Sequence, residues 1–97
     1  MSAEQLRKQI LDLVERYAHE RGSAAAFRAG VTAIPAAGKV LGAGELCHMV
    51  DAVLDGWLTT GRFNAAFEQR LGQFLNVEHV LTTNSGSSAN LLAFSAL

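Results

Sequence analysis

The chain has 97 residues, of which 49% are hydrophobic and 18% are charged, and its formal net charge is −1. This composition is typical of a globular protein, and the length is enough for one small domain at most. The near-neutral charge gives no electrostatic reason to expect nucleic acid or an anionic membrane surface as a partner.

Cysteine content and hydropathy indicate the cellular compartment of the protein and whether it binds metal or spans a membrane. Cys47 is the only cysteine, which excludes an intramolecular disulfide and a cysteine-based metal site built from this chain alone. The N-terminus lacks the apolar core of a signal peptide, and no apolar run approaches the ~20 residues that a membrane-spanning helix needs. We therefore expect a cytoplasmic setting, no membrane association and no metal ligands in this chain.

Residues 1–21 predict an amphipathic helix that forms a segment of its own. Ser2 and Gln5 have the spacing of a capping box, and Gly22 is a typical helix stop. The apolar residues of this helix recur at helical spacing and share one face: Leu6, Ile10, Leu13, Val14 and Tyr17. Residues 22–43 are rich in glycine and alanine and contain the only proline, Pro35, which predicts an irregular connection.

Residues 44–97 predict two helices, a strand and the start of another helix. The first helix spans 44–55 and ends at Gly56, a turn follows at 57–61, and the second helix spans 62–75 and ends at Asn76. Gly72 lies inside the second helix, where glycine costs ~1 kcal/mol relative to alanine. His79–Thr83 predicts a short strand, and a helix is expected from Ala89. The chain stops inside an apolar stretch without a stop signal, which indicates truncation.

The segment between the predicted strand and the last helix has the features of an anion site. The first amides of a helix lack intrahelical acceptors, and the helix dipole adds positive potential there. Gly86 permits close approach of a ligand, and the hydroxyls of Ser87 and Ser88 can donate to the same phosphate oxygens. The same residues are also typical of a simple N-cap and turn, so a small helical interaction domain without catalysis stays an alternative.

Three motifs resemble the DegT/DnrJ/EryC1/StrS sugar aminotransferase family. They are the run LDGWLTTG at 54–61, the pair Phe67-Glu68, and the run SGSSA at 85–89. The resemblance implies an α/β protein with the aspartate aminotransferase fold, fold type I. The chain would then be an N-terminal fragment of the large domain, mostly helical with one short strand. By the family pattern, Gly86, Ser87 and Ser88 contact the phosphate of pyridoxal or pyridoxamine 5′-phosphate, and Thr59, Thr60 and Gly61 lie near the substrate cleft.

The dehydrase branch of this family is the most similar, through residues 35–42, 57–64 and 85–90. The resemblance implies removal of the 3-hydroxyl of CDP-4-keto-6-deoxyglucose in O-antigen lipopolysaccharide biosynthesis, with pyridoxamine phosphate as electron sink. It further implies a homodimer, a [2Fe–2S] cluster and an iron–sulfur flavin reductase as partner. The catalytic base and the cluster ligands would lie outside this chain, so we expect no catalytic residue within it. The alternative from the same family is a PLP-dependent sugar-nucleotide aminotransferase.

Overall fold

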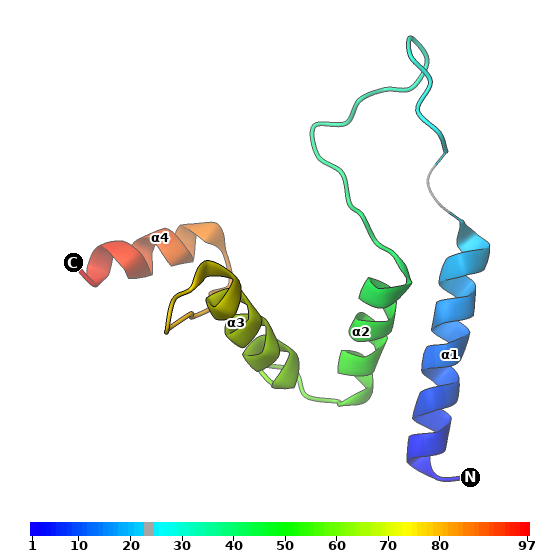
Figure 1. Ribbon diagram of the computed structural model, residues 1–97, viewed down its shortest axis with the longest axis horizontal. Coiled ribbons are helices and arrows are strands. Elements are labelled where there is room, and N and C mark those ends of the chain that lie inside the picture. The colour runs from blue at the N-terminus through cyan, green and yellow to red at the C-terminus, as the bar shows by residue number, and fades with distance from the viewer. Residues whose placement is uncertain (23–24) are drawn as a thin grey trace. The chain divides into compact units, whose positions relative to one another are not determined.

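The computed structural model describes residues 1–22 and 25–97 (Figure 1). The described residues form four helices: α1 (Ala3–Arg21), α2 (Ala43–Leu54), α3 (Arg62–Leu75) and α4 (Gly86–Ser95). They group into two compact units, Met1–Gly56 with α1 and α2, and Trp57–Leu97 with α3 and α4. No helix in the described part is long and apolar enough to cross a membrane. The division into segments 1–21, 22–43 and 44–97 stays a prediction.

α1 begins and ends where its sequence signals predict. The Ser2 hydroxyl accepts a hydrogen bond from the Gln5 amide at 3.2 Å, and the Gln5 side chain accepts one from the Ser2 amide at 2.7 Å. Gly22 has a φ of 71°, and its amide donates to the His19 carbonyl. Because a side chain rarely adopts that φ, glycine is the residue that suits this stop. The predicted capping box and the predicted end of the helix are both confirmed.

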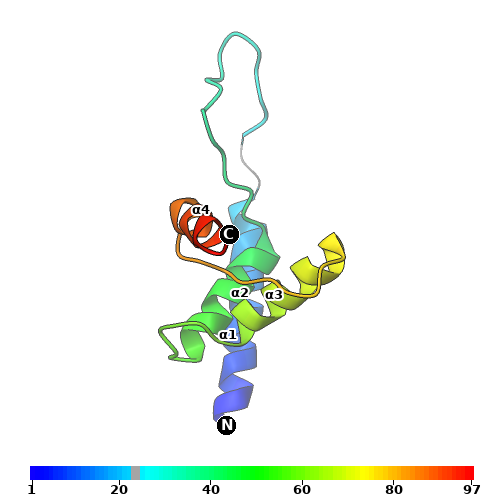
Figure 2. The same cartoon turned by 90° about the vertical axis from the view of Figure 1, so that its left-hand side faces the viewer.

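α1 packs against α2, and the two helices lie side by side with opposite chain directions (Figures 1 and 2). The Arg7 guanidinium reaches across to α2 and lies 2.6 Å from Asp55 Oδ1, while its Nε donates to Asp51 Oδ1 at 2.6 Å. Hydrogen bonds to Asp51 and then Asp55 raise the pKa of Arg7 above its ordinary value. One guanidinium therefore links α1 to two carboxylates at the C-terminal end of α2.

The face of α1 that turns towards α2 is not the predicted apolar face. The partly covered positions are Arg7, Leu11, Val14 and Ala18, whereas Leu6, Leu13 and Tyr17 are 46%, 60% and 62% exposed. Only Val14 belongs to both sets. No hydrophobic residue in the described part of the chain is buried. α1 thus presents two apolar faces, one against α2 and one open to solvent.

The connection between α1 and α2 is irregular in its described residues, 25–42, as predicted; residues 23 and 24 lie outside the description. It contains a turn in which the Val31 and Thr32 amides donate to the Arg28 carbonyl, with Gly30 at a φ of 76°. α2 begins at Ala43, one residue before its predicted start, because the Glu45 carboxylate accepts from the Gly42 amide at 2.7 Å. Gly56 follows the end of α2 with a φ of 63°.

α3 ends at Asn76 as predicted, and the end of the helix explains Gly72. Asn76 adopts a left-handed conformation with a φ of 53°, and the Val77 amide then donates to the Gly72 carbonyl at 2.9 Å. A Cβ at Gly72, which is buried, would lie 3.1 Å from the Val77 carbonyl oxygen and 3.5 Å from Val80 Cγ2. The glycine that weakens α3 by propensity is therefore the residue that lets the chain fold back over its last turn.

The predicted strand at His79–Thr83 is wrong for this structure. These residues have no regular secondary structure, and no strand occurs among the residues that the structure describes. The physical reason is that a strand exists only through ladder hydrogen bonds to a neighbouring strand, and the second unit contains no other segment of that kind. The local β propensity of the run is real, but it has no partner here.

Replacing Gly72 with alanine should destabilise the protein even though alanine is the better helix former. The added Cβ would press on the Val77 carbonyl, whose position is fixed by the helix end, and we expect a loss of about 1 kcal/mol. Gly44→Ala is the matched control, because a Cβ at Gly44 meets nothing within 4 Å, and it should stabilise by about 0.5 kcal/mol. Urea unfolding measures both, and a stabilising Gly72→Ala would contradict this account.

Candidate functional site

The start of α4 leaves two backbone amides without an acceptor. Ser85 is the N-cap; its hydroxyl accepts from the Ser88 amide at 3.1 Å, and its carbonyl accepts from the Ala89 amide at 3.0 Å. The amides of Gly86 and Ser87 have no hydrogen-bond partner among the described residues, and both residues are exposed. α4 therefore begins at Gly86, three residues before the predicted start at Ala89, because Ser85 is its N-cap.

The space in front of these amides is open. A Cβ built at Gly86 would meet no atom within 4 Å. The exposed Ser87 hydroxyl adjoins it, and Ser88, which is half-buried, accepts from the Ser85 hydroxyl at 3.1 Å and retains its own proton for donation. Two unpaired amides, two hydroxyls and a glycine without neighbours fit a phosphate group, which accepts several hydrogen bonds at once.

We call residues 83–88, which lead into α4, the corner. A hydrogen-bond network holds Thr82, the residue directly before it. Glu68 Oε1 accepts from the Thr82 amide at 2.9 Å and from Asn64 Nδ2 at 3.1 Å. The Thr82 hydroxyl lies 2.9 Å from Glu68 Oε1 and 2.7 Å from Asn64 Oδ1. All three side chains are partly buried. The network thus ties Thr82 to α3 through both its backbone and its side chain.

This network also sets the charge state of Glu68. The Thr82 amide, then the Thr82 hydroxyl, and to a smaller extent the Asn64 amide hold the pKa of Glu68 below its ordinary value of 4.5, and partial burial only partly opposes them. Glu68 is therefore ionised at neutral pH. Its charge is met by the Thr82 amide and the Asn64 side-chain amide, and by the Thr82 hydroxyl, whose single proton it shares with Asn64 Oδ1.

A local hydrogen bond also orders the corner itself. The Thr83 hydroxyl donates to the Ser85 carbonyl at 2.9 Å, which closes the turn in front of α4. Together with the Ser85 cap, this bond fixes the direction in which the Gly86 and Ser87 amides point.

The predicted cleft residues Thr59, Thr60 and Gly61 form a separate turn before α3. The Trp57 indole donates to the Thr60 carbonyl at 2.8 Å, and a Cβ at Gly61 would lie 3.2 Å from Trp57 Cδ1. Glycine is needed there because the indole folds over it. In the part of the chain that the structure describes, no hydrogen bond links this turn to Gly86, Ser87 or Ser88, so the two predicted groups are not brought together by direct contact.

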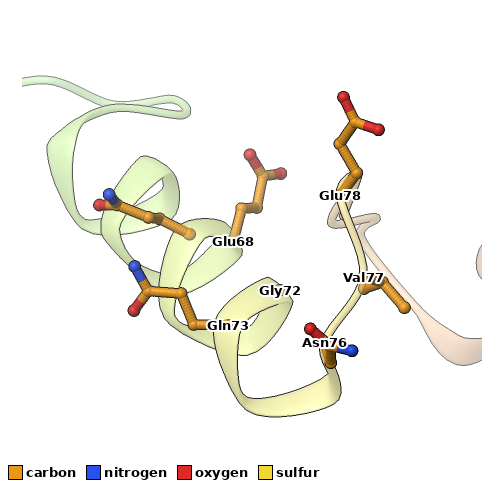
Figure 3. A pocket seen from close by; sticks show the side chains of 7 residues that line it. Glu68, Gly72, Gln73, Asn76, Val77 and Glu78 are labelled. Atoms are coloured by element: carbon orange, nitrogen blue, oxygen red, sulfur yellow. The ribbon is translucent and has the colours of Figure 1, made fainter.

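An open pocket of about 550 Å³ lies at the end of α3 (Figure 3). Its lining comes from α3, with Glu68, Gly72 and Gln73, and from the segment at the helix end, with Asn76, Val77 and Glu78, as Figure 3 shows. Its lining contains none of the predicted phosphate contacts. Within residues 1–22 and 25–97, no group of three or more His, Cys, Asp or Glu side chains could hold a metal ion.

The contact of Asn64 and Glu68 with Thr82 is the part of the site that the sequence did not predict, although Thr82 begins the predicted phosphate-binding turn at 82–90. Asn64 and Glu68 are four residues apart and so share one face of α3. Glu68 had been singled out only as part of the Phe67-Glu68 motif. The long-range partner Thr82 could not be identified from spacing, because 14 residues and a helix end separate it from Glu68.

The comparison with protein families agrees with the motif at the corner. The sequence pattern described as the DegT/DnrJ/EryC1/StrS aminotransferase family matches residues 41–97. The chain belongs to this family. Its members depend on pyridoxal phosphate and have the PLP-dependent transferase fold. Pyridoxal phosphate carries a phosphate group, the kind of ligand that the open amides of α4 could bind.

Two curated relatives extend the similarity to the first unit. The lipopolysaccharide biosynthesis protein RfbH of Salmonella typhimurium is 62% identical over 97 residues, which cover all of this chain and 22% of the relative. The dTDP-4-dehydro-2,6-dideoxy-D-glucose 3-dehydratase of Saccharopolyspora spinosa is 35% identical over 91 residues, which cover 94% of this chain and 20% of the relative. The chain therefore spans about a fifth of the length of these relatives.

The attachment of Thr82 to α3 should weaken in acid. Because the pKa of Glu68 is lower in the folded protein than in the unfolded chain, its contribution is present above pH 4.5 and is lost as pH falls through the folded value. Hydrogen–deuterium exchange, corrected for the intrinsic rate, should show protection of the Thr82 amide falling roughly three- to ten-fold between pH 6 and pH 3.

Glu68→Gln should lower the protection at pH 6 and remove its pH dependence, because an amide side chain does not ionise. Glu45→Gln is the control, since the pKa of Glu45 is also lowered but through backbone hydrogen bonds in the first unit. That variant should leave the Thr82 profile unchanged. An unaltered pH dependence in Glu68→Gln would contradict the assignment.

Proposed function

We propose that this chain supplies the cofactor-phosphate site of a pyridoxamine phosphate-dependent sugar-nucleotide dehydrase. The enzyme would remove the 3-hydroxyl of CDP-4-keto-6-deoxyglucose in the synthesis of a dideoxysugar for lipopolysaccharide O-antigen. The single observation that carries this proposal is the pair of unpaired, exposed amides at Gly86 and Ser87. Gly86, Ser87 and Ser88 are the proposed contacts of the cofactor phosphate.

The chemistry of the corner supports a phosphate ligand. Two helix-end amides with the helix dipole behind them stabilise an anion, and the Ser87 and Ser88 hydroxyls add donors on the same side. Such a site holds the phosphate and thereby orients the cofactor ring, and it moves no proton itself. When bound, pyridoxamine phosphate supplies the amine and the electron sink for loss of the sugar hydroxyl. The catalytic base is proposed to come from outside this chain.

The names of the relatives favour dehydration over amino transfer. One relative is named as a sugar 3-dehydratase and the other as a lipopolysaccharide biosynthesis protein. The family as a whole is described as aminotransferases, so a PLP-dependent sugar-nucleotide aminotransferase is the second candidate. A non-catalytic helical domain is the third candidate. The open space at Gly86 disfavours it, because a purely structural cap has no need for glycine at that position.

Further parts of the proposal come from the family resemblance alone. Thr59, Thr60 and Gly61 are proposed to face the sugar-nucleotide cleft. The complete enzyme is proposed to be a cytoplasmic homodimer with a [2Fe–2S] cluster whose ligands lie outside this chain. An iron–sulfur flavin reductase would supply two electrons, which with one proton form a C3–H bond in place of the C3–OH bond, while a second proton lets the hydroxyl leave as water.

Gly86→Val in the complete enzyme should raise the dissociation constant for pyridoxamine phosphate about ten-fold or more, because the side chain fills the space that the phosphate needs. In the free protein the new Cβ meets nothing within 4 Å, so unfolding by urea should change little. Gly44→Val is a matched control, since Gly44 is also a first-turn helix glycine with an open Cβ direction. Titration by cofactor absorbance gives both constants, and equal affinity in Gly86→Val and wild type would sink the phosphate assignment.

The reaction itself is tested by incubating the complete enzyme with pyridoxamine phosphate, a flavin iron–sulfur reductase and CDP-4-keto-6-deoxyglucose. Mass spectrometry should find a sugar nucleotide that has lost the 3-hydroxyl oxygen and gained no nitrogen. A product that exchanges the keto oxygen for nitrogen, formed only with an amino donor such as glutamate, would instead identify an aminotransferase. The dTDP-linked sugar in place of the CDP-linked sugar tests the nucleotide.

A further inference from the structure

Among the residues that the structure describes, the corner at residues 83–88 is joined to α3 through one neighbouring residue, Thr82. Within the corner, the hydrogen bonds of Thr83 and Ser85 are local and join residues at most four apart. Thr82 alone connects the corner to α3, through bonds that span 14 and 18 residues. The direction of the Gly86 and Ser87 amides therefore depends on how Thr82 is held.

Thr82 is held at two points by one carboxylate oxygen. Glu68 Oε1 accepts from the Thr82 amide and lies equally close, at 2.9 Å, to the Thr82 hydroxyl. Contacts to both the backbone and the side chain restrict the backbone position and the side-chain rotamer of Thr82. Asn64 completes the arrangement, because its carbonyl faces the Thr82 hydroxyl while its amide donates to Glu68. Each polar group in this triangle satisfies another.

We propose that Glu68 is a positioning residue for the cofactor phosphate, acting through Thr82 on the amides of Gly86 and Ser87. The inference rests on the proposed function, since it assigns to Glu68 the geometry of that same site. Hydrogen bonds to phosphate require donors at about 2.7–3.1 Å in a fixed direction. A corner that loses its attachment keeps its donors but no longer presents them together, and binding weakens.

A positioning role and a direct electrostatic role for Glu68 predict opposite results. Glu68 is a carboxylate, so its charge by itself repels a phosphate dianion. If charge were its main effect, Glu68→Gln would tighten cofactor binding. If position is its main effect, glutamine preserves most of the geometry because its carbonyl oxygen still accepts, whereas alanine preserves none of it.

The experiment measures pyridoxamine phosphate binding by the complete enzyme and its Glu68 variants. We expect Glu68→Ala to raise the dissociation constant about ten-fold and Glu68→Gln to raise it only about two- to three-fold. Thr82→Ser should bind as wild type does, whereas Thr82→Val should weaken binding, because only serine retains the hydroxyl. Gln69→Ala is the control for a substitution on the exposed face of α3, and it should have no effect.

Two further measurements separate positioning from general stability. The phosphorus-31 resonance of the bound cofactor should shift in Glu68→Ala, which a merely structural residue would not cause in the folded fraction. The double variant Glu68→Ala, Gly86→Val should weaken binding by less than the product of the two single effects, because both act on the same contact. If Glu68→Ala does not fold, the pair Thr82→Ser and Thr82→Val decides in its place.

The outcomes distinguish this inference from the proposed function. Absence of cofactor binding by the wild-type enzyme would refute the proposed function. Normal binding that is lost in Gly86→Val but unchanged in both Glu68→Ala and Thr82→Val would refute the positioning role alone. Tighter binding in Glu68→Gln would likewise overturn it in favour of charge repulsion.

Discussion

One carboxylate oxygen of Glu68 organises the second unit of this chain. It gathers the Thr82 amide, the Thr82 hydroxyl and the Asn64 side-chain amide around a single acceptor. The arrangement depends on the fold-back at the end of α3, where Gly72 makes room for Val77 and the chain reverses over the helix. Without that reversal, Thr82 could not reach Glu68. The position of the corner therefore depends on the end of α3, where Gly72 permits the reversal of the chain.

The residues of the proposed phosphate site are of two kinds, those proposed to contact the phosphate and those proposed to orient them. Gly86 and Ser87 offer amides that the protein itself leaves unpaired, which is the usual basis of a phosphate site at a helix start. Such amides are common to all helices, so they become selective only when the preceding segment is fixed. Membership of a PLP-dependent family indicates which anion such amides would meet. The Glu68 network holds Thr82, which leads directly into the segment before α4.

Local signals in the sequence predicted local structure well and predicted long-range structure poorly. Ser2, Gly22 and Asn76 mark helix ends by interactions within a few residues, and these predictions are confirmed. The strand at His79–Thr83 failed because pairing depends on another segment, not on propensity. Apolar spacing in α1 did not identify the side that meets α2, where Arg7 pairs with Asp51 and Asp55. The link from Glu68 to Thr82 left no pattern in the sequence at all.

The same distinction explains why the cofactor is easier to infer than the substrate. The hydrogen bonds that hold the corner lie between Asn64 and Ala89, within one compact unit, so the proposal of a phosphate site can be argued from these residues alone. A sugar-nucleotide cleft differs from such a local site, because its lining comes from several segments that each contribute one or two groups. The Thr59–Gly61 turn is ordered by Trp57 and not by the corner. Its proposed role in substrate recognition therefore has no support from the contacts of the corner and rests on the family resemblance.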